Sequence, residues 1–340
     1  HFKNIIINKL REGRMIFTKT IKNIFKLLIA SIIIFCSSSL YAGDEVRFGA
    51  RSTNLEIIII EGEFFQKYNI DPKVVRIKTG VEMGEALIGG SIDVGIVGGA
   101  PLVSALTVAN NIVVLGNAWT TDGGYAKVLV KVDAPYKKIL DLKGKKIANK
   151  IGSGSYRALG DWCKKNGCSY ADFEILNTAP ASIFAALEAG SVEAGIWFAP
   201  TTSIAVHKGI ARVLGDFKGA NLGQATWAGL KSFADKNPEI MSRVMAATVD
   251  AQEFILNNPE KAAEILSRGL KKRGKDIPVE VLAMGINDFH YEHGMTSKKV
   301  EVFEAIFSSA KQAGKLKGDM PDFNSVLNNS YYEAGLKLRN

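Results

Sequence analysis

Cysteine and histidine are scarce in this chain, with three cysteines and four histidines among 340 residues. Three cysteines exclude a disulfide-dense scaffold and a cysteine-rich zinc protein. The sequence shows no Ser/His/Asp or Cys/His grouping, which argues against an enzyme built on an activated nucleophile. A composition of 47% hydrophobic and 23% charged residues excludes a disordered or fibrous chain. We therefore expect a globular protein that is not an enzyme, with no catalytic residue, no metal and no cofactor.

The chain also lacks an apolar run long enough to span a bilayer. Residues 27–36 are apolar except for one serine, but this run is too short for a transmembrane helix. Three lysines precede it, and a small polar segment ending at Ala42 follows it, which is the order of a secretory signal peptide. We predict that residues 1–42 are a leader cut after Ala42, that residues 1–14 are not translated, and that the mature protein is periplasmic. A membrane anchor and a buried N-terminal helix are the alternatives.

A strong charge is missing once the leader is set aside. The formal net charge is +9, but residues 1–42 hold seven Lys or Arg and one Glu, so the remainder carries +3. Such a balanced chain lacks the electrostatic footprint of a nucleic-acid binder. The basic run at 271–275 is typical of a solvated helix end. We therefore expect no nucleic-acid partner.

An internal duplication is the most informative feature of the sequence. Residues 85–96 (EALIGGSIDVGI) and 185–196 (AALEAGSVEAGI) align without a gap at an offset of 100 and share six identities. Each copy reads as the end of a helix, a glycine and a short strand. The two halves of the chain therefore share one architecture.

The strands predicted upstream of these copies also correspond. We expect strands at 46–50 and 74–80 in the first half and at 146–149 and 174–180 in the second, each followed by a loop and a helix. This order predicts an α/β fold of two lobes, each with a largely parallel sheet. Loops at the carboxyl ends of the strands would form the binding face, where helix N-termini favour anions.

The remaining third of the chain is expected to be helical. Asn237-Pro238 and Asn258-Pro259 are typical helix starts, and residues 299–312 have helical apolar spacing. We interpret these helices as packing against one lobe.

Several segments together resemble the substrate-binding proteins of ABC importers for aliphatic sulfonates, taurine and nitrate. The segments are Thr79-Gly80, 86–95, 98–101, 195–200 and, more loosely, 233–239. The resemblance implies a type II periplasmic binding protein fold, in which two α/β lobes enclose a ligand cleft. It implies a first lobe of residues 43–123 plus 229–340 and a second lobe of residues 124–228, with crossings near 121–125 and 223–228.

The resemblance also implies a function without chemistry on the ligand. The protein would capture a small anionic solute between its lobes and deliver it to the permease of an ABC transporter in the inner membrane. We expect it to act as a monomer.

The candidate ligand-binding residues share a position at the carboxyl end of a strand or near a crossing. They are Arg51, Ser52, Thr53, Asn54, Gly80, Val81, Gly98, Gly99, Ala100, Thr120, Thr121, Ser153, Gly154, Ser155, Tyr156, Trp197, Thr201 and Gln224. Arg51 can offer paired donors to a sulfonate or carboxylate, and glycines permit close backbone approach. Further side chains expected to reach the cleft are Trp119, Thr202, Thr226 and Trp227.

Each of these residue types also has a purely structural reading. Ser52, Thr53 and Asn54 can cap a helix, with or without contacting a ligand. Trp197 has apolar neighbours and can pack in the core instead.

The ligand class is narrowed by one departure from the family pattern. Taurine-binding members hold the ammonium with an acidic residue, which aligns here with Ala225, and no glutamate stands at 125–127. This favours an alkanesulfonate or a plain anion over taurine itself. Nitrate, bicarbonate and a thiamine-precursor pyrimidine remain alternatives, as does a pyrimidine-synthesising enzyme of the same fold.

Two smaller patterns stay open. Cys163 and Cys168 flank a predicted helix end, where a short disulfide and two free thiols are equally consistent with the sequence. His290 and His293 have helical i, i+3 spacing, which we interpret as solvated helix residues away from the cleft rather than metal ligands.

Overall fold

The computed structural model describes residues 43–220, 223–312, 314 and 316–339, so the predicted leader at 1–42 lies outside the described residues. The strands are β1 (Asp44–Ala50), β2 (Ile70–Arg76), β3 (Val94–Gly98), β4 (Ile112–Thr121), β5 (Ala126–Lys131), β6 (Lys146–Asn149), β7 (Glu174–Asn177), β8 (Ala194–Phe198), β9 (Ala211–Asp216) and β10 (Gly223–Leu230). The helices are α2 (Asn54–Glu61), α3 (Gly80–Ile88), α4 (Gly99–Leu106), α5 (Gly154–Asn166), α6 (Ile183–Glu188), α7 (Thr201–His207), α8 (Lys231–Lys236), α9 (Pro238–Asn257), α10 (Pro259–Lys271), α11 (Val279–Ala283), α12 (Ser297–Gln312) and α13 (Ser330–Lys337).

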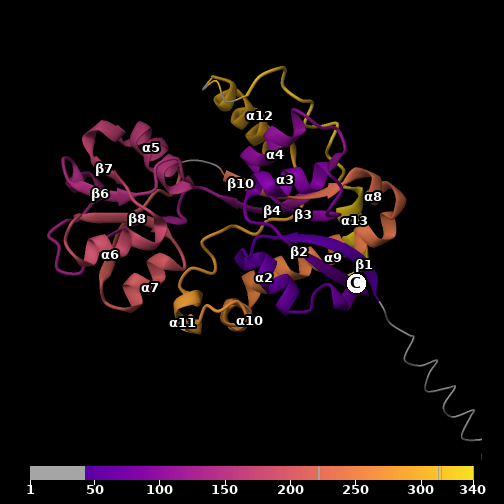
Figure 1. The fold of residues 1–340 in the computed structure, drawn as a ribbon, viewed down its shortest axis with the longest axis horizontal. Helices are drawn as coiled ribbons and strands as arrows, with labels where there is room; N and C mark the ends of the chain where they lie inside the picture. The colour runs from indigo at the N-terminus through magenta and orange to yellow at the C-terminus, as the bar shows by residue number, and fades with distance from the viewer. Residues whose placement is uncertain (1–42, 221–222, 313, 315, 340) are drawn as a thin grey trace, which may run out of the picture. The chain divides into compact units, whose positions relative to one another are not determined.

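The strands form two five-stranded sheets with the same internal order, each flanked by helices (Figure 1). The first sheet has the order β2-β1-β3-β10-β4, and the second has the order β7-β6-β8-β5-β9. The predicted α/β class and the duplication are therefore confirmed at the level of the fold.

Both sheets are largely parallel, as predicted, with one antiparallel strand in each. β1 pairs parallel with β3, and β6 pairs parallel with β7 and β8. One strand in each sheet runs the other way: β10 is antiparallel to β3 and β4, and β5 is antiparallel to β8 and β9. The odd strand in each sheet is the one that arrives directly from the other sheet, so it enters from the opposite end.

The duplicated segment repeats in atomic detail. Gly90 and Gly190 follow their helices with φ of 67° and 72°, the left-handed region that glycine adopts without strain. The next residues, Ser91 and Ser191, each donate a side-chain hydrogen bond to the alanine carbonyl five positions earlier, at 3.2 and 3.0 Å. One sequence pattern thus specifies the same helix end twice.

Most predicted elements lie where the sequence placed them. α9 and α10 begin at the two predicted prolines, and α12 covers the predicted stretch 299–312. The strand expected at 74–80 is instead β2, which ends at Arg76. It ends early because Thr79 and Glu82 form the capping box of α3, which takes over the backbone there.

Helices cover both faces of each sheet and bury separate apolar cores. In the first sheet, α2, α9 and α10 pack on one face, while α3, α4 and α12 pack on the other. In the second sheet, α5 packs on one face, and α6 and α7 pack on the other. Because α2, α3, α4 and α5 each follow a strand directly or after a short loop, their N-termini lie near the carboxyl ends of the strands.

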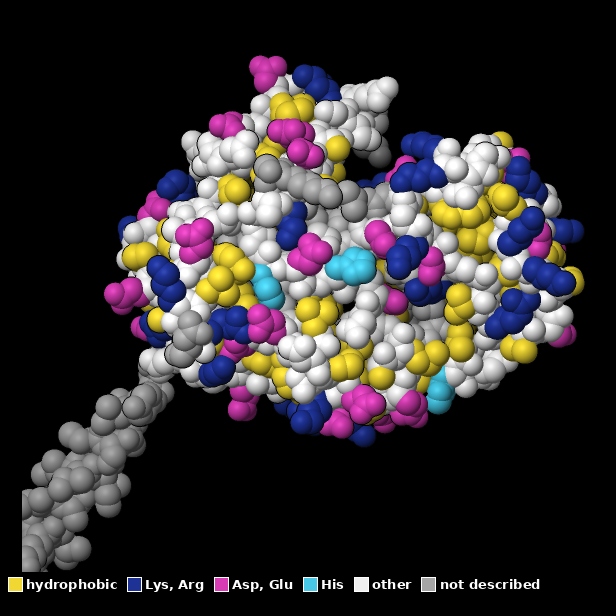
Figure 2. All heavy atoms as spheres, turned by 180° about the vertical axis from the view of Figure 1, so that it is seen from behind, with side chains coloured by type: hydrophobic (Ala, Val, Ile, Leu, Met, Phe, Trp, Pro, Cys, Tyr) yellow, Lys and Arg dark blue, Asp and Glu magenta, His cyan; other side chains and the backbone are white. Residues whose placement is uncertain are grey.

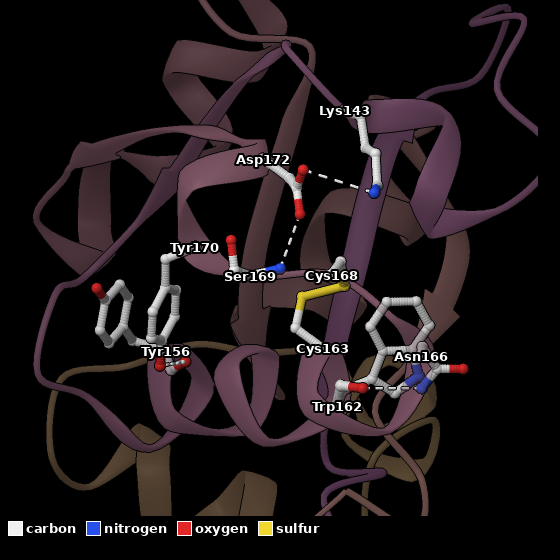
Figure 3. The surroundings of a disulfide bond; sticks show 9 residues. All are labelled: Lys143, Tyr156, Trp162, Cys163, Asn166, Cys168, Ser169, Tyr170 and Asp172. Atoms are coloured by element: carbon white, nitrogen blue, oxygen red, sulfur yellow. Dashed lines mark hydrogen bonds and ion pairs between the residues drawn. A yellow bond between two sulfur atoms is a disulfide. The ribbon is translucent and has the colours of Figure 1, made fainter.

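The two cysteines whose pairing the sequence does not decide form a disulfide at the end of α5. Cys163 and Cys168 are joined, and the backbone N–H of Cys168 donates to the Cys163 carbonyl at 3.0 Å (Figure 3). Nearby, Tyr156 and Tyr170 stack with ring centroids 4.3 Å apart. The disulfide therefore closes the turn that follows α5.

The chain passes between the sheets twice. It leaves the first sheet after Thr121 and enters the second at Ala126, then returns between Asp216 and Gly223. β10 pairs along its length with the first sheet, so the return precedes the stretch 223–228 expected from the sequence. No helix within the described part of the chain is long and apolar enough to cross a membrane.

Candidate functional site

Three helix N-termini meet at the carboxyl edge of the first sheet. Arg51 follows β1, Gly80 begins α3 after β2, and Pro101 lies in the first turn of α4 after β3. A methyl group built on Gly80 would lie 3.7 Å from Nη1 of Arg51 and 2.8 Å from Cγ of Pro101. The structure thus brings three sequence-predicted segments together, and the missing side chain at Gly80 is what allows it.

Arg51 is held there by a buried acid. Its Nε lies 3.7 Å from Oε1 of Glu56, which is fully buried, and neither atom has a hydrogen-bond partner among the described residues. The other Glu56 oxygen accepts the backbone N–H groups of Arg51 and Thr53 at 2.9 and 2.8 Å. Glu56 neutralises the arginine without occupying all of its donors, so the guanidinium keeps capacity for an anion.

The neighbouring polar residues play different roles. Thr53 is the N-cap of α2, and its hydroxyl accepts the backbone N–H of Glu56, which is the helix-capping role considered in the sequence analysis. Ser52 is exposed and has φ of 69°, an unusual conformation for a residue with a side chain. Val81 is exposed at 60% and Ala100 is also exposed, while Asn54 and Gly98 are half-buried. Gly99 is buried beneath Ile306 of α12.

A cluster of polar side chains caps α5 at the edge of the second sheet. We call Asn149, Ser153 and Ser155 the serine cluster. The Ser153 hydroxyl accepts the Tyr156 N–H at 3.2 Å and lies 2.9 Å from the Ser155 hydroxyl, which donates to Asn149 Oδ1 at 2.9 Å. Asn149 and Ser155 are buried, and Asn149 Nδ2 has no partner in the described part of the chain. An unpaired buried donor at a helix N-terminus favours an anion.

Asn149 was missed by the sequence analysis, which assigned it only to a strand. The signal that could have found it is its position as the last residue of β6, the counterpart of Ala50 in the duplication. Gly154 lies against the Tyr125 hydroxyl. Burial raises the pKa of Tyr125, so this hydroxyl keeps its proton at neutral pH. Tyr156, another predicted ligand-binding residue, stacks its ring on that of Tyr170.

The candidate residues at the end of β8 and the start of α7 are partly or fully buried. Trp197 is half-buried, stacks on Phe198 with centroids 4.4 Å apart, and packs against the core beneath α6 and α7. This supports the packing interpretation of Trp197. Thr201 opens α7 and is half-buried, whereas Thr202 is buried.

Residues more than 100 positions apart meet at the crossing. Gln224 of β10 pairs with Thr120 of β4, and Ala225 pairs with Gly98 of β3. Gln224 donates to the Lys299 carbonyl at 2.9 Å, and its Oε1 is buried without a partner among the described residues. Thr121 is buried, and its hydroxyl accepts the Gly123 N–H at 3.2 Å.

Two side chains expected at the cleft lie in the core instead. Thr226 and Trp227 are fully buried, and Trp227 packs against Phe48 with ring centroids 6.1 Å apart. The alternation of β10 turns Trp227 into the core of the first sheet, between β3 and β4. The expectation that these residues reach the cleft is therefore wrong.

The prediction that His290 and His293 are helix residues away from the cleft is wrong. His290 and His293 are not helical, and His290 pairs with Thr120 in an antiparallel bridge, directly at the crossing. His293 lies 3.4 Å from Glu253, and burial lowers its pKa. No group of three or more metal-ligating side chains occurs among the residues that the structure describes.

The crossing brings three acidic side chains close to a lysine and a histidine. Lys127 Nζ lies 3.4 Å from Asp288 and 3.6 Å from Asp216, and His290 lies 3.8 Å from Asp122. Burial raises the pKa of the Asp288 carboxyl, and Lys127 opposes this shift. Asp216 and Asp288 therefore share one lysine, and Asp122 lies beside a histidine.

Comparison with known proteins agrees with the resemblance seen in the sequence. The chain is 25% identical over 317 residues to an Escherichia coli (strain K12) protein named as an aliphatic sulfonates-binding protein, covering 86% of this chain and 99% of the relative. It is 28% identical over 189 residues to the taurine-binding periplasmic protein of the same organism, covering 54% of this chain and 58% of the relative.

Solved structures with the same fold include both a binding protein and an enzyme. The periplasmic aliphatic sulphonate binding protein SsuA from Escherichia coli matches with a TM-score of 0.70 at 22% identity, over 86% of this chain and 100% of that one. The desulfurization enzyme DSZB matches with a TM-score of 0.63 at 14% identity, over 87% of this chain and 100% of that one. The expected periplasmic binding protein fold is confirmed. A model of the family described as NMT1/THI5 like matches residues 56–262, and the chain belongs to that family.

Proposed function

We propose that this protein is the exported solute-binding component of an ABC importer, which captures a small organic anion between two lobes. Each sheet with its helices would form one lobe. The ligand would be an aliphatic sulfonate, passed unchanged to a permease in the inner membrane. The protein would work as a periplasmic monomer, without catalysis.

The observation that carries this proposal is a pair of anion-binding features at strand ends. On the first sheet, Arg51 retains donor capacity beside the start of α3. On the second sheet, the serine cluster caps α5 and leaves Asn149 Nδ2 unpaired. A sulfonate has three acceptor oxygens and a permanent charge, which suit two such features facing it from different lobes.

The further ligand contacts are proposed from the same strand ends. They are Ser52, Thr53, Asn54, Gly80, Val81, Gly98, Gly99, Ala100, Thr120, Thr121, Ser153, Gly154, Ser155, Tyr156, Trp197, Thr201 and Gln224. Backbone N–H groups at the glycine-containing helix starts would supply most of the donors.

A plain sulfonate is favoured over the zwitterion taurine. A ligand ammonium needs an acidic partner, and Ala225 stands at the position that carries an acidic residue in taurine-binding members. On the face shown in Figure 2, acidic and basic side chains are interspersed toward the left, and Lys and Arg predominate toward the right. The small net charge of +3 outside residues 1–42 gives no support to a polyanionic partner.

The test is a thermal-shift screen of the protein without residues 1–42. The panel contains methanesulfonate, longer alkanesulfonates, taurine, nitrate, bicarbonate and an aminopyrimidine. A ligand at 100 times its Kd should add about 2.7 kcal/mol of stability. We expect alkanesulfonates to raise the Tm most; stabilisation by the pyrimidine alone would contradict the anion assignment. An arylsulfinate incubated with the protein and recovered unchanged would separate a binding protein from a desulfurising enzyme.

A further inference from the structure

A short segment near the C-terminus contacts both sheets. We call residues 284–293 the bridging segment; it lies between α11 and α12 in the chain. Its backbone joins the first sheet, because Thr120 N–H donates to the His290 carbonyl at 2.8 Å and His290 N–H donates back at 2.9 Å. Ile286 and Tyr291 are buried in the core of the first sheet. These contacts attach the bridging segment to the first sheet.

The other side of the bridging segment contacts the second sheet. Phe289 stacks on Tyr125, which precedes β5, with centroids 5.5 Å apart and planes at 26°. Asp288 pairs with Lys127 of β5 at 3.4 Å. A methyl group built on Gly285 would collide with Ala199, just after β8. The contacts with Tyr125 and Lys127 lie beside the first crossing, whereas the contact of Gly285 with Ala199 lies away from both crossings in the sequence.

Phe289 is the residue that joins the two sides. It contacts Trp119 of β4 at 4.7 Å and Tyr125 at 5.5 Å, and it packs against the apolar cores of both sheets. Tyr125 in turn packs on Phe198 and places its hydroxyl against Gly154, the first residue of α5. Any rotation of the second sheet about the crossings must therefore slide or break the Phe289 contacts.

We propose that Phe289 is a positioning residue that fixes the second sheet and the start of α5 relative to the first sheet. It does so by packing between the two cores beside the first crossing, where its contacts add a non-covalent connection between the lobes. Its removal would widen the range of lobe orientations and lower the population competent to bind. The effect on affinity rests on the proposed function, whereas the effect on lobe orientation does not.

The test measures lobe orientation without any ligand. Spin labels are placed on Val108→Cys and Val132→Cys, exposed at 78% and 55%, one beyond α4 and one beyond β5. The distance distribution between them is measured by pulsed electron spin resonance in the protein without residues 1–42. Phe289→Ala should broaden or shift this distribution relative to the wild type. Phe289→Tyr, which keeps the aromatic ring, should give the wild-type distribution. Phe289→Leu, which keeps apolar bulk, should give an intermediate distribution and serves if the alanine variant does not fold.

The matched control is Phe254→Ala. Phe254 is also half-buried and pairs edge-on with Phe64 at 5.4 Å, but it packs against the core of the first sheet alone. It should lower the Tm without changing the distance distribution. Folded Phe289 variants with the wild-type distribution would overturn the proposal, because the residue would then be ordinary core packing.

Affinity supplies a second, separable readout. For any sulfonate that binds the wild type, Phe289→Ala should weaken binding at least fivefold and Phe254→Ala less than twofold. Equal losses in the two variants would contradict a positioning role. If no sulfonate binds the wild type, the proposed function fails, while the label distances still decide the role of Phe289.

Discussion

Arg51 and Glu56 face each other across the start of α2, with Nε and Oε1 3.7 Å apart and neither atom hydrogen-bonded within the described residues. The glutamate is fully buried, so its charge depends on the arginine and on the backbone N–H groups that it accepts. The pair therefore serves the fold and, in the proposed function, the ligand.

Replacing Arg51 should weaken anion binding strongly. Arg51→Ala is expected to weaken sulfonate affinity by about 2–4 kcal/mol, because a buried charge pair loses one partner. Isothermal titration calorimetry of the protein without residues 1–42 measures this. Arg268→Ala, which removes an exposed arginine on α10, is the control and should leave affinity unchanged. Unchanged affinity in Arg51→Ala would remove Arg51 from the site.

Two capping boxes give a matched test of burial. α2 and α3 have the same motif, Thr53 with Glu56 and Thr79 with Glu82, but Glu56 is fully buried, whereas Glu82 is half-buried and its hydrogen bonds are exposed. Glu56→Ala should cost about 1–3 kcal/mol, because it leaves buried N–H groups unpaired. Glu82→Ala should cost about 1 kcal/mol or less. Urea denaturation measures both, and equal losses would contradict the role of burial.

Reduction of the Cys163–Cys168 disulfide should lower stability. A loop this short gives about 2 kcal/mol in the chain-entropy account. Denaturation with and without reductant should show this difference, and a Cys163→Ala, Cys168→Ala double variant should be insensitive to reductant. Two titratable thiols in the unreduced native protein would instead favour the free-thiol alternative.

Acid should remove the contribution of Asp250. Burial tends to raise the pKa of this carboxyl, but hydrogen bonds from Lys67, Arg339 and Tyr68 outweigh it and lower the pKa overall. A lowered folded-state pKa stabilises the protein above the unfolded pKa of about 3.9, and the contribution disappears as pH falls through the folded value. The stability difference between wild type and Asp250→Asn, measured from pH 7 to pH 2.5, should therefore shrink on acidification. A difference independent of pH would refute this account.

The sequence determined much of the architecture by itself. The offset of 100 between 85–96 and 185–196, with glycine at the same place in both copies, was enough to predict two matching α/β units. Proline at 238 and 259 marked two helix starts correctly. These features are local, because helix ends and strand starts depend on neighbouring residues.

The site depended more on the tertiary structure. Arg51 and Gly80 were predicted from the loops that follow strands, but the sequence could not show the buried acid beside Arg51. It also could not show that Trp227 points into the core, because the face of a strand depends on which sheet it joins. His290 and His293 were predicted to be solvated helix residues, since nothing near His290 in the sequence reveals its pairing with Thr120.

The sequence alone thus determined the family, the repeated architecture and the strand ends at which an anion site is proposed. Only the tertiary structure decided the mixed order of the sheets and the partners of the buried polar groups. It also decided the position of Phe289 between two cores. Several of these depend on contacts between residues far apart in the sequence, such as Thr120 with Gln224 and with His290, and such contacts form only when the chain has folded.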